Sequence, residues 1–339
     1  MPKRFLGNIM TDAPTAPDGN YISSAASGVW SLAEALSYTK AGLWPNAANL
    51  APRGLFMGGE GSSAYINVIS KVEITTTGNA TDFGDLTVAR TSAGGCSSVT
   101  TALCGGGGTA PASNIIDTVS FATAGNATDY GDLVTTYTDI SACSNNTRGL
   151  FGGGYNGASA RSNVIQYNTI ASAGNSTDFG DLTVGRNALD ACSSTTRGIF
   201  GGGQSTGGLS DVIDYVTIAS TGNATDFGNI LAPANSVSSC SNNTRGLFAG
   251  GYDTARSNVI QYITISSTGN ATDFGDLVTV RSGQGGLSST TRGLFGGGYP
   301  LIDAIDYVTI STTGNATDFG NLPQANYKPD GASNAHGGL

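Results

Sequence analysis

The sequence predicts an all-β protein: a six-bladed β-propeller preceded by a short N-terminal segment. Three observations support this. A seven-residue glycine-containing string recurs six times, 45 to 49 residues apart. A second string, Arg-Gly-Leu/Ile-Phe followed by glycines, alternates with the first. No segment of the repeats has the 3.6-residue apolar period of a helix, whereas short, evenly spaced strands with a glycine and aromatic motif are typical of propeller blades.

The two strings set the boundaries of the repeat. The first reads Gly-Asn-Ala/Ser-Thr-Asp-Phe/Tyr-Gly, and its copies begin at Gly78, Gly125, Gly174, Gly222, Gly269 and Gly314. Copies of the second begin at Arg53, Arg148, Arg197, Arg245 and Arg292, with a degenerate copy at 101–106. We therefore expect the propeller to cover 51–339 and a separate segment to cover 1–50.

One unit predicts four strands in order. An inner strand of small residues comes first, and a tight turn with glycine leads to a second strand that ends in glycines. The third strand is apolar on both faces and should be covered on both sides. A Gly-Asn turn then opens a short outer strand. In one unit these strands span 188–193, 199–202, 211–218 and a segment that starts at Thr225.

The two ends of the repeat predict a closed ring. The first copy begins at its second strand, Arg53, while residues 330–336 match the first strand of a unit. The C-terminal segment can therefore supply the strand that the first blade lacks, which removes the open edge of the ring. A linear solenoid is the alternative architecture, but it gives no reason to split one unit between the two ends.

Each unit resembles a kelch blade, with an apolar strand that ends in Gly-Gly, an Asp-Tyr-bearing strand and then a bulky aromatic residue. The double glycines begin at Gly58, Gly105, Gly152, Gly201, Gly250 and Gly296. Phe or Tyr stands where kelch units usually carry Trp. The resemblance implies a kelch-like propeller and says little about function.

The N-terminal segment contains no repeat string. Ser31 followed by Glu34 predicts a helix N-cap, and we expect a helix that runs to Ala41. Its apolar side is formed by the anchor residues Trp30, Leu32, Leu36 and Trp44. A helix this short must dock, either on its own propeller or as an assembly anchor on another protein. Residues 26–32 and 41–45 resemble leading segments of tailed-bacteriophage virion proteins.

Composition excludes several classes of function. The net charge of −9 argues against a nucleic-acid partner, and no apolar run is long enough for membrane insertion. The single histidine, His336, leaves no multi-histidine metal site and argues against a histidine-based triad. We therefore expect no metal, no cofactor and no enzymatic activity. Without an export signal at the start, we expect assembly in a host cytoplasm.

The cysteines and the repeated turns invite site interpretations that we set aside. Four of the five cysteines share one repeat position on the inner strand, which predicts small core residues with free thiols. Asp82 and Asp85 begin a series of acidic pairs, but one loop offers fewer oxygens than calcium prefers, so we interpret them as turn residues. The Asn-Ala/Ser-Thr strings match glycosylation sequons as a by-product of the same turn.

Three arginines at equivalent repeat positions suggest an anion-binding site. Blades 1, 3 and 5 end in Arg90, Arg186 and Arg281, whereas the other blades have no arginine there. This alternation gives the ring pseudo-threefold symmetry. The guanidinium groups are predicted to ring the channel mouth and bind a carboxylate or phosphate. The alternative is that they pair with nearby aspartates between blades.

The variable loops predict a binding face. Links that enter the inner strand and links that join the second and third strands share one face, opposite the near-identical turns. Variation on one face of a repeat array usually marks its binding side, and Tyr, Ser and Asn are adaptable contact residues. The candidate ligand-binding residues on these loops are Tyr155, Asn156, Gln204, Tyr252, Asp253 and Tyr299.

Together these features predict a non-enzymatic virion protein of a tailed phage, of the tail-fibre or appendage type. It would attach to other virion proteins through residues 1–50, act as a homo-oligomer, and bind a host surface glycan or protein through its variable face. A purely structural virion component, either capsid decoration or a tail or neck connector, is the first alternative. A free kelch-type interaction module is the second.

Overall fold

The computed structural model describes residues 4–6, 9–11, 51–108, 112–156 and 160–339. Spatial contacts divide the chain into two units, Met1–Ala51 and Pro52–Leu339. The described residues of the first unit form one antiparallel pair, β1 (Arg4–Leu6) with β2 (Ile9–Thr11). The predicted helix and the anchor residues Trp30, Leu32, Leu36 and Trp44 lie outside the described residues.

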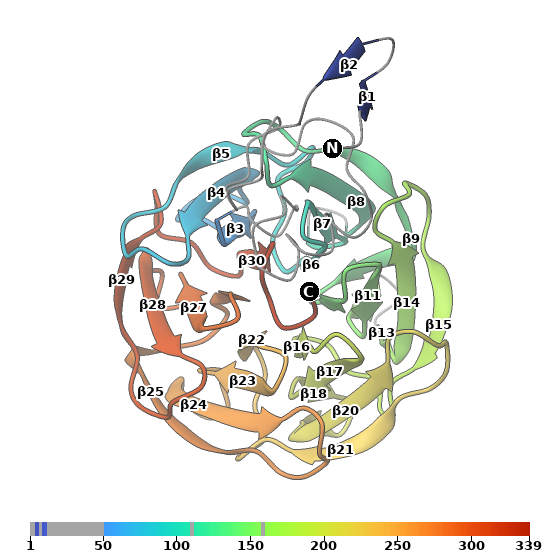
Figure 1. Cartoon of the computed structure of the whole chain (residues 1–339). Coiled ribbons are helices and arrows are strands. Elements are labelled where there is room, and N and C mark those ends of the chain that lie inside the picture. The colour runs from blue at the N-terminus through green and yellow to red at the C-terminus, as the bar shows by residue number, and fades with distance from the viewer. Residues whose placement is uncertain (1–3, 7–8, 12–50, 109–111, 157–159) are drawn as a thin grey trace. The chain divides into compact units, whose positions relative to one another are not determined.

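The second unit confirms the predicted six-bladed propeller. Six antiparallel sheets surround a central channel, and each contains the four strands expected of a blade (Figure 1). From inner to outer strand, blade 1 contains β30 (Asp330–Ser333), β3 (Arg53–Met57), β4 (Val68–Glu73) and β5 (Thr81–Asp85). Blade 2 contains β6 (Gly94–Ser97), β7 (Thr101–Gly105), β8 (Ser113–Ser120) and β9 (Thr128–Thr138). Blade 3 contains β10 (Ser141–Ser144), β11 (Arg148–Gly152), β14 (Val164–Thr169) and β15 (Thr177–Asp181).

The remaining blades repeat this order. Blade 4 contains β16 (Asp190–Ser193), β17 (Arg197–Gly201), β20 (Val212–Thr217) and β21 (Thr225–Asn229). Blade 5 contains β22 (Ser238–Ser241), β23 (Arg245–Ala249), β24 (Ser257–Thr264) and β25 (Thr272–Arg281). Blade 6 contains β26 (Gly285–Ser288), β27 (Arg292–Gly296), β28 (Ala304–Thr309) and β29 (Thr317–Asn321). Two-residue strands in the loops form the pairs β12 (Tyr155–Asn156) with β13 (Ala160–Arg161) and β18 (Gln204–Ser205) with β19 (Gly208–Leu209).

The C-terminal strand closes the ring, as the split repeat predicted. β30 pairs antiparallel with β3, and Leu55 lies opposite Ala332. Each inner strand also contacts the inner strands of both neighbouring blades. Residues from the two ends of the repeat array therefore share one sheet, and the closed ring leaves no blade without its inner strand.

The core lies between blades, and glycines in the second strand make room for it. Phe200 of blade 4 is fully buried against Gly152 of blade 3, where an added Cβ would lie 2.7 Å from the ring. The Sγ of Cys143 similarly occupies the space beside Gly198, 2.9 Å from where a Cβ would stand. All five cysteines are buried free thiols, which confirms that they are small core residues.

The repeated Gly-Asn-Ala turn joins the rims of neighbouring blades. The N–H of Gly125 donates to the carbonyl of Phe83 over 2.8 Å, and the N–H of Ala127 donates to the carbonyl of Asp85 over 2.7 Å. Between these bonds the side-chain oxygen of Asn126 accepts from the N–H of Asp85 over 3.1 Å. The outer edge of one blade is thus covered by the turn of the next, which protects an otherwise exposed strand edge.

Candidate functional site

The propeller has two faces whose connections differ. Because neighbouring strands are antiparallel, the turns that join the first to the second and the third to the fourth strands lie on one face, which we call the turn face. The links between the second and third strands lie on the other, together with the connections between blades, and we call this the loop face. The links of the loop face span 58–67, 106–112, 153–163, 202–211, 250–256 and 297–303.

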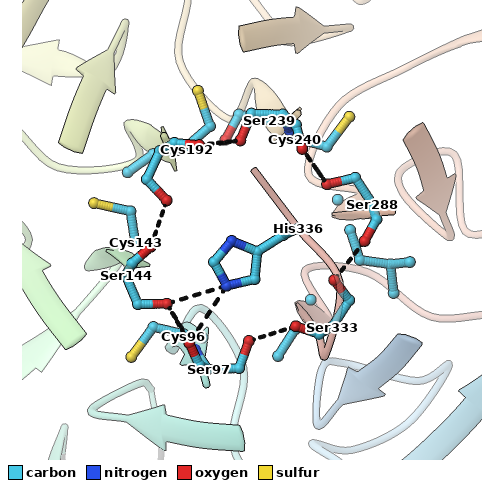
Figure 2. A pocket seen from close by; sticks show the side chains of 18 of the residues that line it. Cys96, Ser97, Cys143, Ser144, Cys192, Ser239, Cys240, Ser288, Ser333 and His336 are labelled. Carbon is cyan, nitrogen blue, oxygen red and sulfur yellow. Dashed lines mark hydrogen bonds between the residues drawn. The ribbon is translucent and has the colours of Figure 1, made fainter. Parts of the chain in front are cut away.

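A ring of serines lines the channel between the two faces (Figure 2). The hydroxyl of Ser144 donates to the carbonyl of Ser97 over 2.7 Å, and the hydroxyl of Ser193 donates to the carbonyl of Ser144 over 2.7 Å. The same bond recurs at every blade and returns to its start. The six hydroxyl donors are Ser97, Ser144, Ser193, Ser241, Ser288 and Ser333. This closed ring holds the inner strands together and leaves their hydroxyl protons bound to protein atoms.

The segment after β30 fills the turn-face end of the channel. The imidazole of His336 lies inside the serine ring, with its Nε2 3.2 Å from the hydroxyl of Ser144 (Figure 2). Its Nδ1 accepts from the N–H of Gly338 over 3.0 Å, which leaves the ring proton on Nε2. Burial lowers the pKa of His336 to about 4, so the imidazole is neutral at pH 7. The remaining cavity beside it measures only about 50 Å³.

Two aspartates stand at the loop-face end of the channel, at the starts of β16 and β30. Burial raises the pKa of Asp190 to about 6, although this carboxylate accepts hydrogen bonds from the N–H of Ser239 and the hydroxyl of Ser141. Burial and then the charge of Asp190 raise the pKa of Asp330 as well. A cavity of about 60 Å³ adjoins them. The channel is therefore narrow at both ends.

The structure corrects the prediction for the three arginines, which are at most 1% exposed. Each guanidinium group passes between two blades and pairs with an aspartate in the third strand of the next blade. The Nη2–Oδ2 distances are 2.5, 2.5 and 2.8 Å for Arg90–Asp117, Arg186–Asp214 and Arg281–Asp306. The prediction that they ring the channel mouth is wrong, because each side chain is buried between two blades, where it meets the aspartate of the next blade. The alternative, an ion pair between blades, is confirmed.

Six backbone bridges hold the links of the loop face. In each bridge, the residue after the glycines of one blade pairs with the residue that leads out of the preceding blade. The pairs are Glu60–Tyr327, Gly108–Thr91, Tyr155–Thr138, Gln204–Asn187, Tyr252–Asn235 and Tyr299–Ser282. Four of the predicted ligand-binding residues, Tyr155, Gln204, Tyr252 and Tyr299, therefore occupy equivalent positions in blades 3 to 6.

An aromatic and cationic cluster lies on the loop face at blades 5 and 6. The side chains of Tyr252 and Tyr299 are 40% and 47% exposed. The guanidinium carbon of Arg256 lies 4.2 Å from the ring centre of Tyr299 and 5.9 Å from that of Tyr252. Tyr327 meets Tyr299 edge-on at 5.8 Å between ring centres. Half-exposed tyrosines beside a cation make a surface suited to ligand contact.

A groove of about 330 Å³ adjoins this cluster. Among its lining residues are Leu231, Pro233, Asp253, Arg256, Val259 and Gln261. The carboxylate of Asp253 accepts hydrogen bonds from the N–H of Ala255 and the hydroxyl of Thr254, which lower its pKa, so it carries its charge. Apolar lining residues with a few polar groups among them are typical of ligand pockets.

The structure does not bring all six predicted loop residues together. Tyr252, Asp253 and Tyr299 belong to the cluster and groove at blades 5 and 6. Tyr155 and Asn156 form β12, which pairs with the end of β9, and Gln204 lies one blade further on. Sequence reasoning missed Arg256 and Tyr327. The available signal for Arg256 was the length of its link. Residues 250–256 of blade 5, which include the tetrapeptide 253–256, form a shorter link than residues 153–163 of blade 3.

Two features are absent from the described part of the chain. No group of three or more His, Cys, Asp and Glu side chains there is placed to hold a metal ion. No helix in that part is long and apolar enough to cross a membrane.

Comparison with known proteins gives no family assignment. No protein-family model matches the chain, and no curated protein matches it. The fold and the loop-face geometry are therefore the observations from which function has to be argued.

Proposed function

We propose that this protein is a non-enzymatic adhesin whose propeller binds a host surface glycan or protein through the loop face. The observation that carries the proposal is the exposed cluster of Tyr252, Arg256 and Tyr299, which lies beside a groove on the face where the links differ. On the turn face, the side-chain oxygens of the repeated asparagines are engaged between blades instead.

We further propose that the protein is a component of a tailed-phage virion, a tail fibre or appendage assembled in the host cytoplasm and attached through residues 1–50. The support is the resemblance of residues 26–32 and 41–45 to leading segments of such virion proteins. The kelch-like Gly-Gly strands support a propeller that serves as an interaction module. The virion would present the chain as a homo-oligomer.

Immunogold electron microscopy of purified particles with an antibody to this chain tests the location. Label at the tail tip or fibres is expected. Label over the capsid or neck would favour the structural alternative, and absence of label would contradict the virion proposal.

A binding assay tests the face. The full chain should bind susceptible cells, and Tyr252→Ala with Tyr299→Ala should reduce binding about tenfold or more, since truncated aromatic anchors commonly cost at least that much. The matched control is Asn223→Ala on the turn face, for which cell binding should stay within about twofold while stability falls slightly. Equal binding by the tyrosine variant would contradict the proposal.

A structural role remains the second candidate because one observation favours it. The Arg–Asp pairs occur at three of the six blade interfaces and alternate around the ring. This pseudo-threefold order would suit a threefold seat on a particle.

A further inference from the structure

Arg256 differs from every other cation in the described propeller, residues 51–108, 112–156 and 160–339. Several arginines have a buried Nε without a partner, but Arg256 is the one whose guanidinium group also forms no ion pair and donates no hydrogen bond there. Each remaining arginine of this part donates to a carbonyl, amide or carboxylate oxygen. Lys71 and Lys328 pair with Glu73 and Asp139. In a protein with a net charge of −9, an unpaired arginine needs an explanation.

The surrounding residues hold Arg256 in place but accept no hydrogen bond from its guanidinium group. The Tyr299 ring supports the guanidinium group at 4.2 Å, and the backbone of Arg256 is bridged to Tyr252. Stacking on a ring uses the flat face of the group, whereas hydrogen bonds leave from its edge. The edge carries five N–H donors in a fixed fork that matches the two oxygens of a carboxylate. The site is therefore prepared for an anion that the described chain does not supply.

The chain contains its own comparison for this site. Arg161 of blade 3 is the repeat equivalent of Arg256, since both are preceded by Ala and followed by Ser-Asn-Val-Ile-Gln-Tyr. The Nε of Arg161 donates to the side-chain oxygen of Asn187 over 2.9 Å. The bridge next to Arg161 joins Asn187 to Gln204. In the equivalent bridge next to Arg256, Ser282 stands in the place of Asn187 and Tyr299 in the place of Gln204. Blades 5 and 6 thus lack the internal acceptor and gain an exposed aromatic ring.

We propose that Arg256 binds the carboxylate of an acidic sugar unit whose ring packs on Tyr252 and Tyr299. This inference rests on the proposed function, because it names the ligand class of the loop face. A single guanidinium group fits a singly charged planar carboxylate, and half-exposed tyrosines fit the apolar face of a sugar ring. The adjoining groove of about 330 Å³ has room for a neighbouring unit of the same glycan.

Asp253 places a negative charge near the positive charge of Arg256, at the same site. Its carboxylate is charged and exposed at the turn that leads to Arg256. It offers acceptors for sugar hydroxyls but repels an anionic ligand. Asp253→Asn should therefore tighten binding of an acidic glycan and leave a neutral one unaffected, and added salt should weaken binding of the acidic glycan.

The experiment measures binding of the full chain to two acidic probes, oligogalacturonate and α2,8-linked polysialic acid. Methyl-esterified oligogalacturonate is the neutral counterpart of the first, and carboxyl-reduced polysialic acid is that of the second. At least one acidic probe should bind more tightly than its neutral counterpart. Arg256→Gln should lose tenfold or more of that affinity, because bonds to charged groups are worth that much. Arg161→Gln, the matched control, should stay within about twofold, and thermal melting should show both variants folded.

Ser282→Asn tests the mechanism without removing the arginine. The new side chain should accept from Arg256 as Asn187 accepts from Arg161, and should weaken binding of the acidic probe severalfold. The inference is overturned if neither acidic probe exceeds its neutral counterpart, or if Arg256→Gln binds like wild type. Binding to susceptible cells is measured in parallel. Cell binding without acidic-probe binding refutes this inference alone, whereas Arg256-dependent probe binding without cell binding refutes the proposed host adhesion alone.

Discussion

The two faces of the propeller use their residues in opposite ways. On the turn face, six near-identical turns each present an asparagine whose side-chain oxygen accepts a backbone N–H of the preceding blade. On the loop face, the six links share backbone bonds near their glycines but differ in their side chains, which range from a paired Arg161 to an unpaired Arg256. Repetition therefore serves assembly of the ring, and variation leaves side chains available for other contacts.

A second alternation runs around the ring at the interfaces between blades. At three interfaces a buried arginine crosses to an aspartate, while at two of the others a buried glutamine accepts a backbone N–H. Gln166 accepts from Val134 over 2.8 Å, and Gln261 accepts from Leu231 over 2.6 Å. Charged and neutral interfaces thus alternate within one fold, and substitutions can compare them directly.

The largest expected effect comes from breaking a charged interface. Asp214→Ala leaves Arg186 buried without its carboxylate, and we expect a loss of about 3–5 kcal/mol in the free energy of unfolding. Gln166→Ala at the neutral interface should cost about 1–2 kcal/mol. Chemical denaturation measures both. Replacing the pair together, by Arg186→Met with Asp214→Leu, should recover much of the loss, and equal costs for the two single variants would contradict the contrast.

A steric change at the rim is expected to be next in size. Gly84 has φ +152°, and an added Cβ would lie 2.2 Å from the carbonyl oxygen of Gly125. Gly84→Ala should therefore destabilise the propeller by about 2–3 kcal/mol. Gly125→Ala is the matched control, because nothing lies within 4 Å of its added Cβ. Thermal melting of the two variants should show a large difference. Similar melting temperatures would show that the backbone around Gly125 can shift to make room for the added Cβ.

The two ends of the channel should respond to acid in opposite directions. His336 has a folded pKa of about 4, against 6.5 ordinarily, so between these values the unfolded chain binds a proton that the folded chain does not. Its contribution to stability is therefore lost as the pH falls from 6.5 to 4. Asp190 has a folded pKa of about 6, against 3.8, so its folded form takes up the proton and gains stability as the pH falls from 6.

Each response can be isolated by substitution. Between pH 7 and 4, the stability of His336→Asn relative to wild type should rise by roughly 1–3 kcal/mol, and that of Asp190→Asn should fall by a similar amount. Urea denaturation at several pH values measures both differences. Parallel stability curves for wild type and either variant would mean that the corresponding group does not titrate as described.

The sequence predicted the ring well because the information was repeated. Six copies of the Gly-Asn-Ala turn indicated the blade number, and the match of residues 330–336 to an inner strand indicated the closure. The pairing of the arginines was also present as a pattern. Arg90, Arg186 and Arg281 end the odd blades, and the Ile-Asp pairs that contain Asp117, Asp214 and Asp306 occur in the even blades. From the sequence we expected only nearby aspartates as partners, and this matching alternation was the available signal for which three they are.

Features that occur once could not be predicted in this way. Arg161 and Arg256 stand in the same local sequence, and they differ because Asn187 reaches one whereas Ser282 stands in the equivalent place beside the other. That difference depends on a neighbouring blade. The position of His336 also depends on distant parts of the chain, because the segment after β30 brings its imidazole to Ser144 of blade 3. Single contacts between distant segments carry no periodic signal.

The smallest expected effect on stability lies on the loop face. It tests directly whether the loop-face side chains are free of a structural role. Asn175→Ala on the turn face removes an acceptor that lies 3.0 Å from the N–H of Asp132, so we expect a cost of about 1 kcal/mol. Tyr299→Ala removes a half-exposed ring from the loop face and should change stability by less than about 0.5 kcal/mol, because little of it is packed in the core. If Tyr299→Ala cost more than Asn175→Ala, the ring would be a structural part of the blade interface, and its exposure would no longer support a binding role.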